Sequence, residues 1–146
     1  MATRREVLIG AVESAAEVAK GIMLEQGRLQ TTVLVLGGGM QMKDVIPMPL
    51  DDGAMVQTYG LTLRRVVRER EPEALIVVTT QDSVVPETGS GWRHVVTLAG
   101  VSPQARHNLR LVYRREGANL VYEGPIEGDA GGSGNMLTRG LWDFVN

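Results

Sequence analysis

The sequence predicts a two-layer α+β domain, in which a mainly antiparallel sheet of about five or six strands is packed by two helices and followed by a short C-terminal element. The chain has 146 residues, a length at which one compact core is the usual outcome. Two stretches carry apolar residues at helical spacing, and the last four apolar runs follow one another with only turns or loops between them. That order is typical of an antiparallel meander, so we expect both helices on one side of the sheet.

The first predicted element is a helix over residues 4–26. Thr3 and Glu6 have the spacing of a capping box, in which each side chain satisfies a backbone amide at a helix start, and Gly27 is placed to end the helix. The apolar residues at helical spacing are Leu8, Ala11, Ala15, Val18, Ala19, Ile22 and Met23. This narrow, alanine-rich face can closely approach a sheet or another helix, so a packing helix is favoured and a seam between two copies is the alternative.

A hairpin with a glycine turn is predicted next. Residues 31–36 form a β-rich run that stops at three glycines, 37–39, and residues 41–50 form a second short run. Pro47 and Pro49 place this second strand at an edge, because proline cannot donate to a strand ladder. The glycines do not match a phosphate-binding loop, since neither G-x-G-x-x-G nor a Gly-Lys-Ser/Thr ending is present there.

A second helix is predicted after Asp51 and Asp52, whose carboxylates complement the positive end of a helix dipole. Its apolar residues at helical spacing are Met55, Val56, Tyr59, Leu63, Val66 and Val67. Arginines and glutamates alternate toward its end, which is typical of a solvated, salt-bridged face. Residues 74–80 then form a continuous apolar run of strand length, which indicates a central strand buried on both faces.

Three further strands are predicted over residues 92–98, 108–115 and 119–126, with polar loops at 81–91 and 102–107. In the first of these strands, alternate residues including Trp92 and His94 share one face. The last two strands flank a short turn and form a hairpin.

The sequence changes character after residue 127. We expect residues 1–127 to form the α+β domain, and residues 128–146 to form a glycine-rich linker followed by a docked tail. Leu141, Trp142 and Phe144 in this tail are the predicted interface residues. They dock either on the chain's own core or on a neighbouring copy.

Few residues support catalysis or metal binding. The chain has no cysteine and two histidines, His94 and His107, which lack a spacing that brings two ligands onto one metal. We therefore expect no metal site and no cofactor. Asp82, Ser83 and His94 are the candidates for a hydrolase or transferase site, although no serine lies in the G-x-S-x-G pattern of a nucleophile elbow.

Positive charge is concentrated between Glu87 and Glu116, where no acidic residue occurs. The candidate residues for binding an anion or nucleic acid are Arg93, Arg106, Arg110 and Arg114. Pairing of these arginines with Glu123 on a neighbouring strand explains the same pattern. The few aromatic side chains offer little base stacking, so self-association between basic and acidic surfaces is favoured over nucleic-acid binding.

Together these features favour a non-catalytic binding, assembly or accessory protein that acts through protein–protein contacts, as a homo-oligomer or with a protein partner. A small hydrolase or transferase and a nucleic-acid-contacting regulator are the alternatives. The first residues are polar, and the apolar stretch after them is interrupted by Glu13, Glu17 and Lys20. We therefore expect neither a secretory leader nor a membrane span, and a cytoplasmic location.

Overall fold

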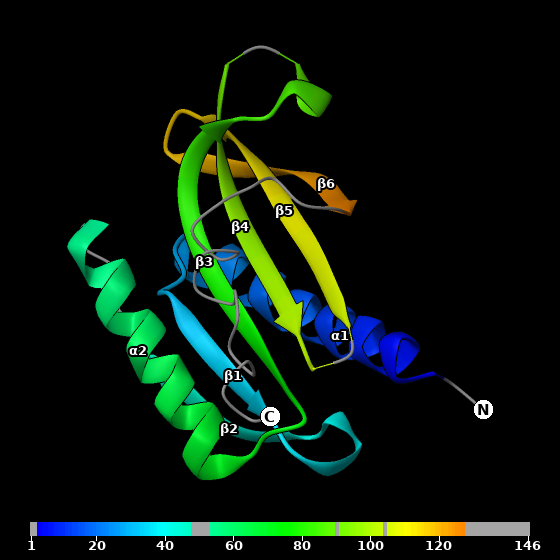
Figure 1. The fold of residues 1–146 in the computed structure, drawn as a ribbon. Helices are drawn as coiled ribbons and strands as arrows, with labels where there is room; N and C mark the ends of the chain where they lie inside the picture. The colour runs from blue at the N-terminus through cyan, green and yellow to red at the C-terminus, as the bar shows by residue number, and fades with distance from the viewer. Residues whose placement is uncertain (1–2, 48–52, 90, 104, 128–146) are drawn as a thin grey trace.

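All the strands lie in one antiparallel sheet, in the order β2-β1-β3-β4-β5-β6. The computed structural model describes residues 3–47, 53–89, 91–103 and 105–127, with the backbone alone described for residues 4 and 53–59. The elements are α1 (Arg4–Gln26), β1 (Thr32–Leu36), the 3-10 turn η1 (Gly38–Met40), β2 (Met42–Pro47), α2 (Gly53–Arg70), β3 (Ala74–Val84), the 3-10 turn η2 (Pro86–Thr88), β4 (Trp92–Val101), β5 (Arg106–Glu116) and β6 (Asn119–Glu127) (Figure 1). The predicted α+β class, a mainly antiparallel sheet packed by two helices, is confirmed.

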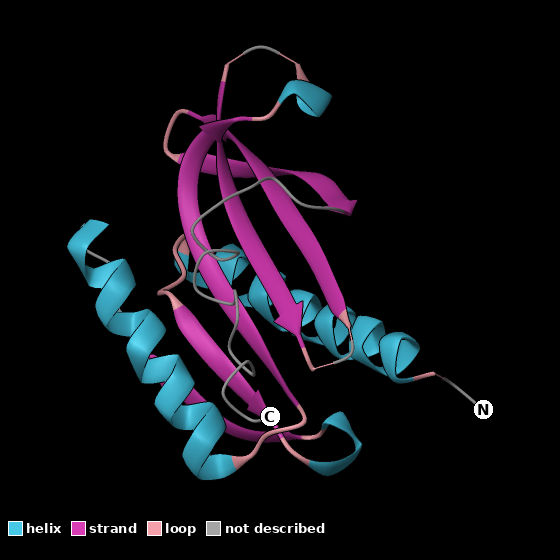
Figure 2. Cartoon of the chain, in the orientation of Figure 1, coloured by secondary structure: helices cyan, strands magenta, loops and turns pink. Residues whose placement is uncertain are grey.

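The two helices lie on opposite faces of this sheet, which corrects the expectation that they share one side. Leu8 of α1 belongs to a cluster with Ile76 of β3, whereas Leu63 of α2 packs with Leu75 and Val77 of the same strand. Figure 2 shows α1 behind the strands and α2 on the near side. Successive residues of a strand point to opposite faces, so the continuous apolar run of β3 supplies both clusters. We call the two sides the α1 face and the α2 face.

Both ends of α1 are fixed as the sequence predicts. The Glu6 backbone N–H donates to Thr3 Oγ1 at 3.1 Å, and the Thr3 N–H donates to the Glu6 carboxylate at 3.4 Å. At the other end Gly27 adopts the left-handed conformation and donates its N–H to the carbonyl of Met23 at 2.9 Å. A residue with a side chain is strained in that conformation.

A glycine in β4 sets how closely α1 approaches the sheet. A Cβ atom on Gly100 would lie 2.5 Å from Val12 Cγ2 and 3.2 Å from the carbonyl oxygen of His107. Real Cβ atoms do not come this close to a neighbour, because carbon atoms in contact are about 3.5–4.0 Å apart. The absence of a side chain at this position therefore lets α1 lie directly on the strand.

The predicted glycine-turn hairpin is confirmed. β1 and β2 pair antiparallel, with an irregularity between Val35 and Leu36, and β2 lies at the sheet edge. The turn is held by Glu73, whose carboxylate accepts from the Met40 N–H at 3.1 Å and whose own N–H donates to the Leu36 carbonyl at 2.9 Å. The described part of this strand ends at Pro47, and residues 48–52 lie outside the described ranges.

The predicted loops at 81–91 and 102–107 are shorter in the structure. β3 continues to Val84, because Gln81–Val84 stays paired with Trp92–Val95 of β4, and β5 already begins at Arg106. Gln81, Asp82 and Ser83 are polar and partly exposed, so this part of β3 resembles a loop in composition. Their backbone groups are nevertheless satisfied by the neighbouring strand, which favours an extended ribbon beyond the core.

Candidate functional site

Asp82 and His94 come together on the α1 face of the sheet. They are directly opposite each other in β3 and β4, and His94 Nδ1 lies 2.9 Å from Asp82 Oδ1. Arg115 of β5 approaches the same carboxylate oxygen at 3.7 Å. The hydrogen bond from His94 is the main cause that lowers the pKa of Asp82 below its ordinary value, with a smaller contribution from the charge of Arg115. The imidazole is thus oriented by a carboxylate, as in a catalytic pair.

Ser83 does not join this pair. It follows Asp82 in a strand, so its side chain points to the opposite, α2 face, and its hydroxyl donates to the carbonyl of Val84 at 3.3 Å. A serine nucleophile needs its hydroxyl within hydrogen-bond reach of the histidine. The described residues therefore bring together two of the three catalytic candidates and separate the third from them.

Tyr113 is a neighbour of His94 that the sequence analysis did not single out. It lies opposite His94 in the β4–β5 register and is almost completely buried. Neither its hydroxyl nor His94 Nε2 has a hydrogen-bond partner among the residues that the structure describes. Burial raises the pKa of Tyr113 to about 12, and its ring packs against Tyr122 with centroids 5.3 Å apart. The site thus holds a histidine whose second nitrogen is shielded from solvent, beside a neutral phenol.

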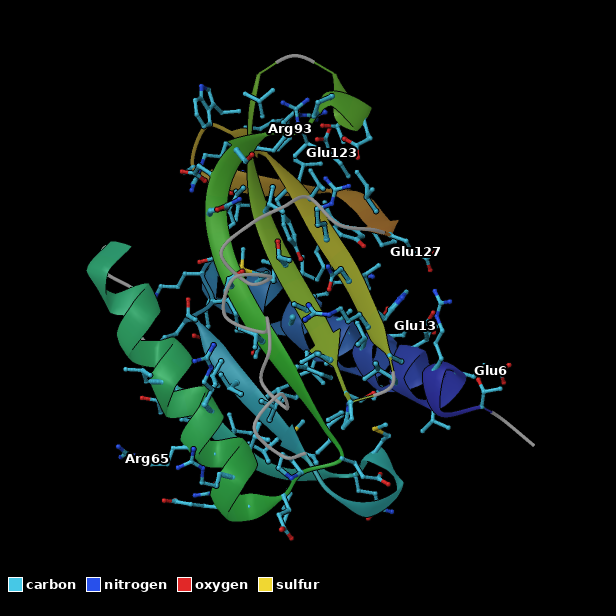
Figure 3. The ribbon with its side chains drawn as sticks, in the orientation of Figure 1. Glu6, Glu13, Arg65, Arg93, Glu123 and Glu127 are labelled. Carbon is cyan, nitrogen blue, oxygen red and sulfur yellow. The ribbon has the colours of Figure 1, made fainter. Side chains whose placement is uncertain are left out.

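Arg93, Arg110 and Arg114 form ion pairs with carboxylates. Arg93 contacts the Glu123 carboxylate at 2.5 Å (Figure 3). Arg114 approaches the same carboxylate at 3.3 Å. Arg110 is buried and donates to Glu87 at 2.7 Å. This hydrogen bond is the main cause that lowers the pKa of Glu87. An incoming phosphate would therefore have to displace a carboxylate that already balances the charge.

Arg106, the fourth candidate, lies at the exposed start of β5. Among the described residues, no group of three or more histidine, aspartate or glutamate side chains could hold a metal ion. The predicted interface residues Leu141, Trp142 and Phe144 lie outside the described part of the chain.

The outward side of α1 carries an exposed row that the sequence analysis missed. We call it the outer stripe, and its residues are Val7, Gly10, Ser14, Val18 and Gly21. They recur at intervals of three and four residues, which places them on one side of a helix. Val18, predicted to lie on the buried face, is instead 65% exposed. The buried row is instead Leu8, Val12, Ala16, Ala19 and Met23.

Both glycines of the outer stripe are without close neighbours in the described part of the chain. A Cβ atom added to Gly10 or Gly21 would meet no described residue within 4 Å. The charged residues Glu13, Glu17 and Lys20 lie to one side of the stripe, where Lys20 pairs with Glu17 at 3.6 Å and covers the Tyr122 ring at 4.7 Å. The stripe itself contains no charged residue.

A mainly apolar hollow of about 350 Å³ borders the stripe on its other side. It separates α1 from the β1–β2 hairpin. The residues that line it are Val7, Gly10, Ala11, Ser14, Ala15 and Val18 of α1, with Leu36, Gly39, Met40, Met42 and Ile76 opposite. The outer stripe is therefore a ridge with an apolar hollow beside it, a shape that suits contact with a second apolar element.

Comparison of the chain with known protein families, with curated protein sequences and with solved structures finds no match. Within the described ranges, neither helix contains a segment of the length and apolarity needed to cross a bilayer.

Proposed function

We propose that this protein is a non-catalytic assembly protein that self-associates through the outer stripe of α1. The observation that carries the proposal is an uncharged row on the outward side of a helix whose opposite side is already buried. A helix at a protein surface normally turns charged and polar residues to water on that side. Val18 instead exposes 65% of its side chain there, and Val7 36%.

The glycines add support of a different kind. Glycine inside a helix costs about 1 kcal/mol relative to alanine, and no contact with the described residues requires Gly10 or Gly21, because a Cβ would meet none of them at either position. A second helix that lies close to α1 gives these two positions a purpose, since side chains there would hold the backbones apart.

The two alternative functions have less support. A serine hydrolase that uses Asp82 and His94 needs a hydroxyl beside the histidine, and Ser83 points to the other side of the sheet. A nucleic-acid-binding surface needs available positive charge, whereas Arg93, Arg110 and Arg114 each contact a carboxylate.

A matched pair of charge insertions tests the proposal. Val18 and Leu61 are both 65% exposed, but Leu61 lies on α2, away from the stripe. We expect sedimentation velocity over a range of concentrations to show a dimer or larger species for the parent chain and for Leu61→Glu, and a monomer for Val18→Glu. A parent chain that stays monomeric at every concentration, or equal association of both variants, contradicts the proposal.

The predicted tail contact is tested by the same measurement. If Trp142 docks on a neighbouring copy, Trp142→Ser in the full chain lowers the association constant. If the outer stripe carries the contact, this change leaves the association constant near that of the parent.

A further inference from the structure

We propose that a polar hollow beside Arg110, on the α2 face of the sheet, binds the carboxylate group of a small molecule, and that Glu87 competes with this ligand for the arginine. The site lies apart from the outer stripe and does not depend on self-association. Three observations carry the proposal. They are a buried arginine with an unused donor, a polar hollow beside it, and a half-exposed carboxylate that already contacts the arginine.

The α2 face changes from apolar to polar along the strands. Val77 and Ala99 lie opposite each other in the apolar cluster under α2, and the next pair on the same face is Thr79 and Thr97. Arg110 of β5 lies opposite Thr97 on the other side of β4. Beyond its apolar cluster, the α2 face therefore continues as a polar surface to which β5 contributes a guanidinium.

Arg110 is buried, but its hydrogen-bonding capacity is not filled. Only 7% of the residue is exposed. Its Nη2 donates to the Glu87 carboxylate at 2.7 Å, whereas its buried Nε–H has no acceptor among the described residues. A donor that is shielded from water and left without a partner is unfavourable, above all on a charged group. The Nε–H and one Nη2–H of a guanidinium point the same way and match the two oxygens of one carboxylate. Glu87 thus uses half of a bidentate site.

A polar hollow of about 240 Å³ lies beside this guanidinium. The described residues that line it include Gln81, Ser83 and Thr97, whose side chains can donate hydrogen bonds. Within this described lining, Arg110 is the only cation and Glu87 the only anion. The volume is below the range of about 300–1,000 Å³ that is usual for pockets of drug-sized ligands. The hollow therefore suits a small molecule rich in hydrogen-bond acceptors.

The balance of charge favours a carboxylate over a phosphate. A carboxylate that replaces Glu87 at Arg110 leaves the hollow neutral, because each carries a single negative charge. A phosphate monoester, with a charge of about −2 at neutral pH, would leave an excess negative charge beside one arginine. Removing an uncompensated charge from water is costly. The group that already contacts the arginine is itself a carboxylate.

Glu87 can leave the arginine without disturbing the turn that carries it. Its side chain is 48% exposed. The neighbouring Thr88 donates from both its N–H and its hydroxyl to the carbonyl of Val85, each at 3.0 Å. The Thr88 carbonyl in turn accepts from Arg93 at 3.3 Å. These contacts hold the backbone of η2 in place while the Glu87 carboxylate turns toward water.

NMR of the arginine side chains measures binding directly. Sodium acetate is the carboxylate probe, sodium phosphate is the second oxyanion, and sodium chloride at matched ionic strength controls for charge screening. We expect acetate to shift the Arg110 Nε–H signal in a saturable way, with a dissociation constant in the millimolar range. A shift equal to that in chloride overturns the proposal. Saturation by phosphate at a lower concentration than by acetate also overturns it.

Two glutamate substitutions separate a binding site from a purely structural ion pair. Glu87 and Glu116 each contact an arginine of β5, Arg110 and Arg114 respectively, and their side chains are 48% and 57% exposed. Glu87→Gln should lower the dissociation constant of acetate about fivefold or more, because it removes the competing charge. Glu116→Gln makes the same change of charge away from the hollow and should alter this constant by less than about twofold. Equal constants for the two variants contradict competition at Arg110.

A substitution of the arginine tests the bidentate contact. Arg110→Lys keeps the positive charge but loses the planar pair of donors. We expect it to weaken acetate binding about tenfold or more, as followed by the backbone amide signal of Thr97 opposite this residue. Acetate binding with the parent affinity by a folded Arg110→Lys variant overturns the proposed contact.

Discussion

Gly100→Ala should destabilise the fold, although alanine is ordinarily the better strand residue of the two. The new Cβ would lie 2.5 Å from Val12 Cγ2, about 1 Å inside normal contact. Val12 is fully buried and stiff at χ1, so its methyl cannot turn away. Overpacking of this kind costs about 1–3 kcal/mol, and removing an interior glycine returns about 0.5–1 kcal/mol. We therefore expect a net loss of about 1–2 kcal/mol in the free energy of unfolding.

A double-mutant cycle tests the cause of that loss. Val12→Ala alone should cost about 2–3 kcal/mol, through lost burial and a cavity. In the Val12→Ala background the obstructing methyl is gone, so Gly100→Ala should become neutral or stabilising. Urea unfolding followed by circular dichroism measures all four chains, at one fixed protein concentration because self-association would add to the apparent stability. An equal cost of Gly100→Ala in both backgrounds would refute the reasoning.

The remaining predictions concern titration and ion pairing. The pKa of Asp82 is lower in the folded chain than its ordinary value of about 4. The ionised carboxylate therefore stabilises the fold at pH values above about 4, and this contribution is lost as the pH falls through the lower folded-state pKa. His94→Asn should raise the pKa of Asp82 in a carboxyl NMR titration, because the hydrogen bond from His94 is the main cause of the lowered value. Burial raises the pKa of Tyr113 to about 12, so the stability that its neutral form contributes is present below the ordinary tyrosine pKa of about 10 and is lost as the pH rises toward 12. Tyr113→Phe should be neutral or stabilising in urea unfolding near neutral pH, because the hydroxyl has no partner among the described residues. Glu123→Gln should cost roughly 2–3 kcal/mol in the same assay, because the nearly buried Arg93 guanidinium loses its carboxylate; a cost near zero would argue against a structural ion pair.

The elements of the fold were predictable because each has a local cause. The capping box at Thr3 marks the start of α1, and the three glycines at 37–39 mark the turn after β1. The sides of the sheet on which the helices lie were predicted incorrectly. The sequence does contain a hint, since residues 74–80 are apolar without alternation and so need cover on both faces.

The candidate site was predictable only where the period of a strand could be applied. That Trp92 and His94 share a face follows from alternation alone, but the pairing of His94 with Asp82 depends on the register between β3 and β4. Register is set by the whole sheet and its turns. The outer stripe was missed because Val18 has the same helical spacing as the apolar residues predicted to be buried. Only the burial of Ala16 and Ala19 shows which side of α1 faces the sheet.

The order of α1 and its packing partners along the chain has a consequence during synthesis. α1 is made before β4 and β5, on which it packs, and Trp92 follows Gln26 only after 66 further positions. At roughly 5–20 residues per second the ribosome needs several seconds to supply those strands. During that interval both the inner row of α1 and its outer stripe face solvent. Self-association through the outer stripe, as proposed above, would therefore follow folding, because the inner row of α1 is covered only by the finished sheet.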